Sequence, residues 1–494
     1  MPRMASRLTR LRVDSDGDAA KGHRRRRRVL RPRVKRRRTV VSEEAVDDGA
    51  DRRAEYAKIA MRMLKDGNLM LCDAFVKHGD PAGVWFYDGK MWHHPFGSHG
   101  SSQGLFEALK KPLVEAACKG RLSIPFLTIK TNHVKEFINT VKNFIIAKRP
   151  SFVVMNHYKI SDMRTKARTL LPMRGGCLDL SGEKPVIVLP TPREALFSPG
   201  ELLPADCPRT LEELEKHGYD DLLNMFKAVL SDEWGVFFEC VVLTICGNKH
   251  QKFPVFHGPR SVLKSSVAVV LGTALGPARC PMPGVDAAMA SERWATRAAD
   301  APEKAKINNK FGNSYIRGID EVDSKARRVH YASIKGEQTP YGMFGLPYAF
   351  SFVKAPVLPM YYCTTNDPPE DIFTAPVSAK DAEDILLFDT SKNVFVPGKV
   401  LTKEEAELQK ATKQWFLDLE NKPSEERRAN LILQLACMVV WWMTMPAERV
   451  AAQKRMPELT LAADRKRRTA AHLEVRRTRT ENGELLLPKV RRNG

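Results

Sequence analysis

Hydrophobic and polar positions divide the chain into segments with helical spacing and segments with short strand-like runs. Near residue 54, hydrophobic residues begin to recur every three to four positions, which predicts the first helix of the folded part. Two more helices are expected over 104–119 and 133–148. The stretch WFYDGKMWHH lies between the first two helices, and its Asp88-Gly89 dipeptide separates two aromatic runs, which predicts a β-hairpin.

The second half of the chain alternates helix and strand patterns more regularly. Residues 150–210 contain many polar residues, Pro and Gly, and predict short strands joined by glycine turns. Beyond them the pattern predicts helices over 211–230 and 232–247, strands within 313–323 and 355–369, and helices over 402–420 and 428–445. Alternation of this kind favours an α/β domain.

Positive charge is concentrated at the two ends of the chain. The 494 residues carry a formal net charge of +22. Residues 1–40 contain 16 Lys and Arg against three Asp, and residues 464–494 contain ten against four acidic residues, so the ends hold +13 and +6 and the remainder only +3. Basic ends attract polyphosphate chains without reading sequence. The run GHRRRRRVLRPRVKRRR also fits a nuclear-import signal or a solubilising disordered arm.

The composition disfavours several classes of protein. Nine Cys lie far apart with no C-x-x-C pair, so they are expected to be reduced thiols of an intracellular protein rather than a disulfide scaffold. The start has no secretory pattern, and three Asp within 14–18 argue against a transit peptide. The apolar segment 431–445 is short for a bilayer and contains Gln434, so a buried helix and no membrane partner are expected.

The stretch VFHGPRSVLKSSVAVVLGTALG (255–276) has the layout of a phosphate-binding loop. A short apolar run ends in Gly258-Pro259, Lys264 and Ser265 follow, and an apolar helix begins there. Such loops bind anions because successive backbone N–H groups at a helix N-terminus point at the ligand. The lysine contacts the terminal phosphates and the hydroxyl binds Mg²⁺.

Polar residues at the ends of two later strand-like runs supply the other parts of a nucleotide site. YIRGIDEVD contains Asp320-Glu321, and an aspartate at such a strand end helps to hold Mg²⁺ while the adjacent glutamate can act as general base on water. VLPMYYCTTNDPP runs into Asn366, whose amide can hydrogen-bond the γ-phosphate and help to position the water. Each residue alone also fits a turn or a helix cap, but their order and spacing favour the nucleotide site.

Together these motifs resemble a superfamily 3 helicase of the primase-helicase type found in phages, poxviruses and other large DNA viruses. The resemblance rests on Gly-Pro-x4-Lys-Ser, strand-Asp-Glu and strand-Thr-Asn-Asp-Pro-Pro in that order, and on YASIKGEQTPYGMFG, where Lys335-Gly336 matches a turn of the family. WFYDGKMWHH and MRGGCLDLSGEKP resemble motifs of the family's N-terminal helper domain, with Gly175 in place of the usual Asn. The similarity spans about residues 55–395.

The resemblance implies an α/β fold with an AAA+-like P-loop NTPase core, an N-terminal mixed α+β helper domain and disordered basic tails. It implies a homo-oligomeric ring, usually a hexamer, that hydrolyses ATP with Mg²⁺ and translocates on single-stranded DNA in a viral or mobile-element replication system. The expected location is the nucleus or a viral replication site. The expected domains are a basic arm (1–50), the helper domain (51–210), the ATPase core (211–400), a helical segment (401–460) and a basic tail (461–494).

The resemblance also assigns roles to single residues. ATP would be bound by Gly258, Pro259, Lys264, Ser265 and Ser266, and Mg²⁺ by Ser265 and Asp320. Glu321 and Asn366 would be catalytic, and Lys335 would touch single-stranded DNA. The nearby Tyr331 and Tyr341 fit either base stacking or the hydrophobic core, and core packing is the simpler interpretation.

Two departures from the family pattern fall on catalytic parts. Leu263 replaces the glycine before the lysine, and a leucine costs about 1–3 kcal/mol there if the loop keeps its shape. The stretch that matches the family's arginine finger has Glu383 and Asp384 where Arg-Arg would stand, and the nearest cations, Lys380 and Lys392, are not bidentate donors. The alternative is therefore a catalytically weakened homologue that acts as a nucleic-acid-binding scaffold. A third interpretation is a basic structural or packaging protein with an accidental loop match.

Overall fold

The computed structural model describes most of the folded chain. The described residues are 44–72, 84–87, 92–93, 102–147, 157–158, 160–189, 195, 202–247, 252–280, 315–325, 328–337, 342–345, 352–355 and 360–481. Most of the predicted basic arm, the turn Asp88-Gly89 and Tyr341 lie outside them.

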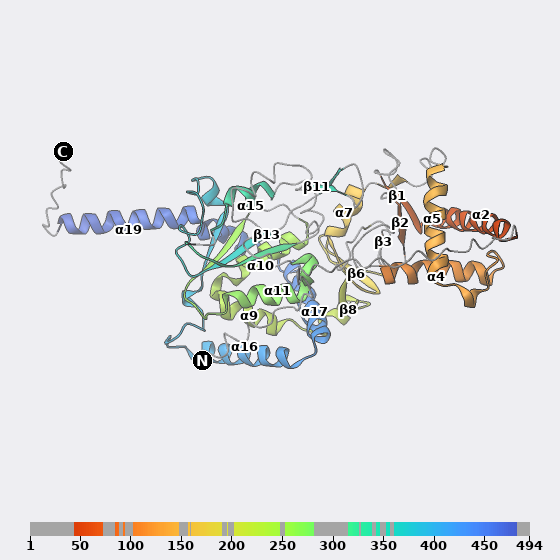
Figure 1. Ribbon diagram of the computed structural model, residues 1–494. Helices are drawn as coiled ribbons and strands as arrows, with labels where there is room; N and C mark the ends of the chain where they lie inside the picture. The colour runs from red at the N-terminus through yellow and green to blue at the C-terminus, as the bar shows by residue number, and fades with distance from the viewer. Residues whose placement is uncertain are drawn as a thin grey trace, which may run out of the picture.

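A four-stranded parallel sheet forms the centre of the larger part of the molecule (Figure 1), with the strand order β10-β13-β9-β14. Its strands are β9 (Phe253–His257), β10 (Ile316–Val322), β13 (Met360–Thr365) and β14 (Ile385–Asp389). All six residues of β13 are buried, which is typical of a parallel strand covered on both faces.

Successive side chains of these strands belong to two different hydrophobic cores. Tyr362 and Phe388 pack in the larger core, whereas their neighbours Tyr361 and Leu387 pack in a second core. This period of two places one core on each face of the sheet. The α/β class predicted from the sequence is confirmed.

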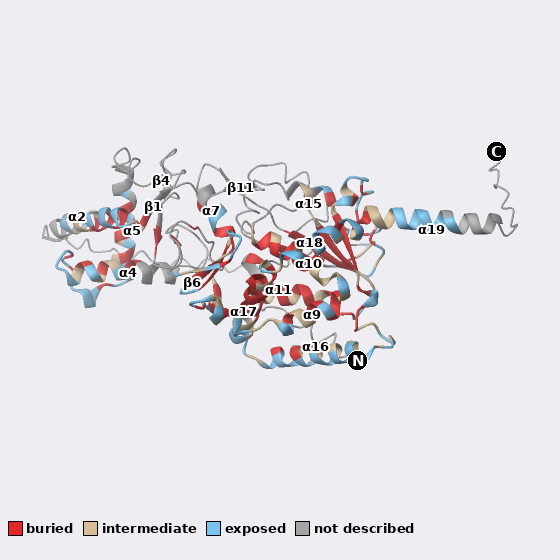
Figure 2. Ribbon diagram, turned by 180° about the vertical axis from the view of Figure 1, so that it is seen from behind, coloured by how far each residue is buried: buried red, intermediate tan, exposed pale blue. Residues whose placement is uncertain are grey.

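Helices cover the larger core, and their buried faces are red in Figure 2. They include α9 (Asp220–Leu230), α10 (Trp234–Ile245), α11 (Lys264–Arg279), α16 (Lys403–Asn421), α17 (Ser424–Met443) and α18 (Pro446–Arg455). Every residue from Leu431 to Val440 in α17 is buried, so the predicted buried helix is confirmed. Among the described residues no single helix could span a membrane; Ser424–Met443 and Pro446–Leu459 pass that test only as a pair bent by 89°.

One predicted helix is broken in two. The single helix expected over 211–230 is α8 (Leu211–Glu215) followed by α9, because Gly218 takes a φ of 64° between them. Left-handed backbone ends a helix, and glycine reaches it without steric cost. The helix predicted over 402–420 agrees closely with α16, which begins with a capping box between Thr402 and Glu405.

A second sheet packs against the larger core. Its order is β7-β6-β5-β8, formed by β5 (Leu170–Arg174), β6 (Gly176–Asp179), β7 (Val186–Val188) and β8 (Leu203–Asp206). Gly175 turns the chain between β5 and β6 with a φ of 85°, as the predicted glycine turns require. Leu171, Leu178 and Leu203 share the core of α9 and α17, so this sheet adjoins the central one although the sequence suggested a domain boundary at 210.

The N-terminal part has a hydrophobic core of its own. Helices α2 (Glu44–Lys65), α4 (Ser102–Cys118) and α5 (Thr131–Ala147) lie beside a sheet of β1 (Leu69–Cys72), β2 (Val84–Tyr87), β3 (Trp92–His93) and β4 (His157–Tyr158). The antiparallel pairing of β2 with β3 confirms the predicted hairpin. Because α2 begins at Glu44, the last residues of the arm expected to be disordered are helical.

The start of the basic tail is also helical, which corrects the expectation of disorder. Helix α19 (Leu461–Glu481) contains no Gly or Pro and many good helix formers, and Asp464 pairs with Arg468 one turn later. The remaining described helices and strands are α7 (Ile160–Arg168), α15 (Tyr331–Glu337), β11 (Gly342–Gly345), β12 (Phe352–Ala355) and the 3₁₀ turns Phe126–Thr128, Ser231–Glu233, Asp381–Glu383, Thr390–Lys392 and Met456–Leu459.

Candidate functional site

The loop singled out in the sequence joins strand β9 directly to helix α11. The strand ends at His257 and the helix begins at Lys264, which gives the strand–loop–helix unit that a phosphate-binding loop requires. The loop turns sharply, because Gly258, Ser261 and Leu263 have φ values of 143°, 64° and 63°.

Gly258 lies where the loop passes closest to the segment after β14. A Cβ atom at this position would clash with Oγ1 of Thr390 and stand 3.1 Å from the backbone nitrogen of Ser391. Both its dihedral angles and its surroundings therefore require glycine.

Leu263 adopts the left-handed conformation that the missing glycine would take. Its φ and ψ are 63° and 21°, a conformation that costs an L-residue about 1–2 kcal/mol. Its side chain is partly buried against the larger core, which offsets some of that cost. The loop therefore keeps its turn despite the substitution.

Lys264 is the chemical centre of the loop. Only 7% of the residue is exposed, and its Nζ donates to the carbonyls of Gly258 at 2.7 Å and Pro259 at 2.5 Å. It also donates to Oδ1 of Asn366 at 2.9 Å. Two predicted site residues from separate motifs thus contact each other.

The carboxyl ends of the four central strands lie side by side. Val322 pairs with Thr365, Thr365 with His257, and His257 with Asp389. The candidate residues Asn366 and Gly258, each next to a strand end, therefore meet at one edge of the sheet.

The Asp320-Glu321 pair forms an irregularity in β10. The register with β13 shifts between Ile319 and Val322, and Glu321 has a φ of 54°. The backbone N–H of Glu321 donates to Oγ1 of Thr364 at 3.0 Å, and the residue is exposed one position before the end of β10. Bulges and positive φ values that re-aim a side chain are common beside active sites.

Ser265 and Ser266 occupy the first turn of α11. Ser266 is buried, and its N–H donates to the carbonyl of Leu263 at 3.0 Å. Ser265 is half-buried one residue after the lysine. Its pairing with Asp320 on Mg²⁺ stays a prediction, and within the described residues no group of three or more His, Cys, Asp or Glu could hold a metal.

Two residues that no sequence pattern indicated fasten the loop from the β14 side. The buried Thr390 donates through Oγ1 to the carbonyl of His257 at 2.9 Å, and the buried Asn393 donates through Nδ2 to the carbonyl of Val262 at 2.8 Å. Their only signal is the polar run DTSKN directly after a hydrophobic strand. Such a run is ordinary for a turn.

Two charged contacts restrain the neighbouring strand-end loops. Oδ2 of Asp367 accepts from the backbone N–H of Ser324 at 2.6 Å, and this hydrogen bonding lowers the pKa of Asp367. Arg465 of α19 forms two 2.6 Å bonds to the carboxylate of Glu370, and its hydrogen bonding lowers the pKa of that group. Both contacts fall within the first five residues of the loop that begins with Asn366, so they hold the start of that loop in place.

His257 stands at the end of β9, opposite Asp389 of β14. Burial lowers the pKa of His257, while Asp389 and Asp464 oppose that shift. Burial alone would raise the pKa of Asp389, but hydrogen bonds from Ser391 and the nearby His257 more than offset it and lower the pKa. His257 at this edge of the sheet therefore interacts electrostatically with Asp464 at the base of α19.

Lys335, the predicted nucleic-acid residue, is engaged within the chain. It lies in α15, and its Nζ is 2.5 Å from Oδ1 of Asp381 and 3.5 Å from Oδ2 of Asp384. Asp384 also pairs with Lys252 at 3.4 Å. The acidic residue found at the expected arginine-finger position is thus part of an intrachain ion-pair cluster. Tyr331 is buried and packs on Phe373, as its interpretation as a core residue predicted.

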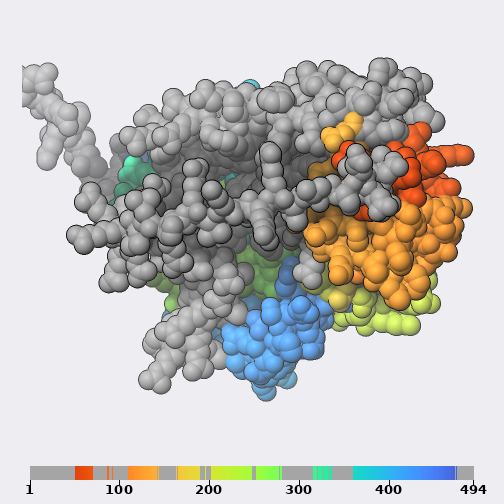
Figure 3. Space-filling view, turned by 45° about the vertical axis from the view of Figure 1, so that its right-hand side comes forward, coloured from red at the N-terminus to blue at the C-terminus, as the bar shows by residue number. Residues whose placement is uncertain are grey.

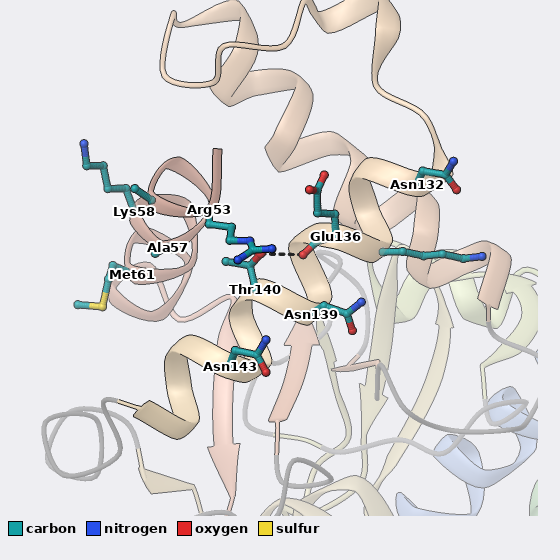
Figure 4. A pocket seen from close by; sticks show the side chains of 11 residues that line it. Arg53, Ala57, Lys58, Met61, Asn132, Glu136, Asn139, Thr140 and Asn143 are labelled. Carbon is teal, nitrogen blue, oxygen red and sulfur yellow. Dashed lines mark hydrogen bonds between the residues drawn. The ribbon is translucent and has the colours of Figure 1, made fainter. Parts of the chain in front are cut away.

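A separate hollow lies between α2 and α5 in the N-terminal part. Figure 4 shows Arg53 and Lys58 on one side and Asn132, Asn139 and Asn143 on the other. In Figure 3 the red surface of α2 adjoins the orange surface of α4 and α5. None of the predicted site residues lines this hollow.

Comparison with known proteins gives a limited result. No family model matches the sequence, and no curated protein matches it. Among solved structures, the A form of the apo C-terminal region of NrS-1 is similar at 14% identity with a TM-score of 0.31, over 60% of this chain and 59% of that chain. A further apo structure of that region is 12% identical, with a TM-score of 0.28 over 48% of this chain and 51% of the other. The chain thus spans only about half the length of that neighbour, and TM-scores this low do not establish a shared fold.

Proposed function

We propose that this chain is an ATP-dependent motor of the helicase type that translocates on single-stranded DNA as a homo-oligomeric ring. One observation carries the proposal: Lys264, the first residue of α11, contacts Asn366, which directly follows the adjacent strand β13. Two residues that the proposal assigns to a triphosphate site, 102 residues apart in the sequence, are thus in contact at one sheet edge.

The sheet topology supports a ligand site at this position. From β9 the chain continues to β10 at one edge of the sheet, and from β13 it crosses to β14 on the other side of β9. In open α/β sheets, ligands bind beyond the carboxyl ends of the strands where the connections part in opposite directions. The loop after β9 lies at such a point.

The loop residues suit an anionic ligand. The three acceptors of Lys264 described above are neutral oxygens, and a phosphate oxygen is a stronger acceptor for an ammonium. The first turn of α11 adds backbone N–H groups and the positive end of a helix dipole. In this proposal Lys264 exchanges its carbonyl partners for the terminal phosphates, while Gly258, Pro259 and Ser266 shape the loop around them.

The remaining residues take the roles that their chemistry allows. Ser265 and Asp320 would hold Mg²⁺, which supplies charge neutralisation at the phosphates. Glu321 would accept the proton of the attacking water as general base, and Asn366 would orient that water through its amide. Lys335 would contact the DNA backbone once it leaves its acidic partners.

A second candidate function is a nucleic-acid-binding scaffold with little hydrolysis. The observation that favours it is Asp384, which stands at the expected finger position and pairs with Lys252 and Lys335. An arginine finger contributes about three to five orders of magnitude to turnover, so an acidic residue there favours slow hydrolysis.

ATP turnover by the purified full chain, with and without a single-stranded oligonucleotide, distinguishes the two candidates. Lys264→Ala is the test variant, and Lys410→Ala on the exposed face of α16 is the matched control. DNA-stimulated turnover that is lost only in Lys264→Ala would support the motor. Turnover in Lys264→Ala equal to that of the unmodified chain would overturn it, and DNA binding without turnover would favour the scaffold.

A further inference from the structure

Helix α19 leaves the body of the molecule after its first turn. Leu461 is fully buried and Arg465 is fastened to Glu370, so the base of the helix is part of the fold. From Lys466 to His472 every residue is exposed, although the helix continues to Glu481. Figure 1 and Figure 2 both show it extending away from the remaining elements.

Over residues 466–472 the helix buries no residue in the core, although Arg467 donates to the carbonyl of Glu458 at 2.7 Å. Helices in proteins gain most of their stability from a packed apolar face, and isolated ones shorter than about 12–15 residues are marginal in water. A helix with few apolar residues is stable when it bridges domains through solvent or when side-chain pairs one turn apart support it, as Asp464 and Arg468 do at the base of α19. The charge of the segment indicates which kind of molecule would suit it.

Residues 466–481 carry six Lys and Arg against two Glu. The positions of Arg468, His472, Arg476 and Arg479 are spaced by four, four and three residues, which places them on one side of a helix. Each residue turns an α-helix by about 100°, and at this turn positions 466 and 477 lie more than about 100° from the centre of that side. The segment thus has a basic side that suits a polyanion.

The form of the segment favours a duplex over a single strand. Proteins hold single strands in basic grooves with aromatic side chains on which bases stack, and residues 466–481 contain no Phe, Trp or Tyr. An α-helix is about 10–12 Å across and the major groove of B-DNA is about 12 Å wide, so a lone basic helix fits that groove. Sixteen residues span about 24 Å at 1.5 Å each, a large part of the roughly 34 Å turn of the duplex.

We propose that the outer part of α19, residues 466–481, binds duplex DNA with the side formed by positions 468, 472, 476 and 479. The inference does not rest on the proposed ATPase, because it needs neither the loop nor a nucleotide. Binding at this helix would also act close to the nucleotide site, since Arg465 at its base holds the loop that begins with Asn366.

Two double variants that lose the same charge test which side of the helix contacts DNA. Arg476→Gln with Arg479→Gln removes two cations from the basic side, and Lys466→Gln with Arg477→Gln removes two from elsewhere on the same segment. Fluorescence anisotropy of a labelled 24-base-pair duplex and of a labelled 24-nucleotide dT strand is measured with the full chain, without ATP, at about 150 mM salt, where non-specific charge contacts are weakened. We expect the first pair to lose about tenfold in duplex affinity and the second less than threefold, with the dT affinity of both within twofold of the unmodified chain.

A helix-breaking variant separates helical binding from attraction by a charged tail. Ala471 is exposed, so Ala471→Pro leaves the core and the net charge intact while it interrupts the helix, and Ala471→Ser is its control. A drop in duplex affinity of about tenfold in Ala471→Pro alone is expected. Equal losses in the two double variants, or unchanged duplex binding in Ala471→Pro, would overturn the proposal in favour of attraction by charge alone.

Discussion

The ammonium of Lys264 lies 2.9 Å from Oδ1 of Asn366 and also donates to the carbonyls of Gly258 and Pro259. The loop after β9 is therefore closed around its own lysine and fastened to the end of β13. Binding of a phosphate at this loop would therefore require Lys264 to exchange its hydrogen-bond partners, and would not require a loose segment to become ordered. Substitutions at single positions distinguish what the loop, its lysine and the neighbouring ion pairs each contribute to stability and to ligand binding.

Gly258→Ala should lower the free energy of unfolding by about 2 kcal/mol or more, because the new Cβ would meet Thr390 and the backbone of Ser391. Gly398→Ala is the control, since Gly398 also has a positive φ, 79°, but no atom lies within 4 Å of the place that its Cβ would take. Its cost should be only about 1 kcal/mol, from the dihedral angles alone. Chemical denaturation measures both values, and equal costs would contradict the close approach.

Leu263→Gly should change the dissociation constant of ATP by less than about threefold, which is below 1 kcal/mol. Leu263 already has a left-handed backbone without ligand, so its strain lowers the stability of the fold rather than the affinity. Titration with a fluorescent ATP analogue checks this expectation. A tenfold gain in affinity would mean instead that the leucine side chain crowds the phosphates.

Leu263→Ile should destabilise the protein by about 1 kcal/mol or more, because β-branched residues rarely adopt positive φ. Leu271→Ile within α11 provides a buried control at helical dihedral angles, and thermal unfolding compares the two. Equal destabilisation would argue against backbone strain at the loop.

Asp381→Asn should strengthen binding of a dT oligonucleotide about two- to fivefold if Lys335 contacts DNA. The substitution weakens the 2.5 Å ion pair that holds the ammonium, so the cation becomes available to a phosphate. Asp418→Asn on α16 makes the same change in net charge at an exposed position. The gain should vanish when Lys335→Ala is added, and a gain that survives would exclude Lys335 as its source.

The pair Arg465–Glu370 predicts a defined dependence of stability on pH. Hydrogen bonding from Arg465 lowers the pKa of Glu370 below its ordinary value of 4.5, so the pair stabilises the fold above that pH. This contribution is lost as the pH falls through the lowered pKa of the folded state. The stability of Glu370→Gln, measured by denaturation between about pH 5 and pH 3, should therefore fall less steeply than that of the unmodified chain. Parallel curves would contradict the assignment.

Local sequence was enough to predict the central parts of the fold and two residues of the candidate site that the structure brings into contact, Lys264 and Asn366. The apolar run before Gly258 and the apolar segment after Lys264 became β9 and α11, because strand–loop–helix units are specified by adjacent residues. Asn366 could be placed at the same sheet edge because the carboxyl ends of parallel strands lie side by side. The turn at Gly175 followed from the conformational freedom of glycine.

Features that depend on distant contacts could not be predicted. Asn393 and Val262 lie 131 residues apart, and nothing in the DTSKN run indicates that it fastens the loop. The pairing of Lys335 with Asp381 likewise depends on where α15 meets a 3₁₀ turn 46 residues later. The tail from residue 461 was expected to be disordered because it is strongly basic, whereas residues 461–481 form a helix without Gly or Pro.

Equilibrium binding of Mg²⁺–ATP, followed by fluorescence of a labelled analogue, tests the central claim most directly. The unmodified chain and Lys410→Ala should bind saturably, while Lys264→Ala should lose at least about tenfold in affinity, or 1.4 kcal/mol. Equal binding by Lys264→Ala, or no binding by the unmodified chain, would contradict the assignment of this loop as a nucleotide site.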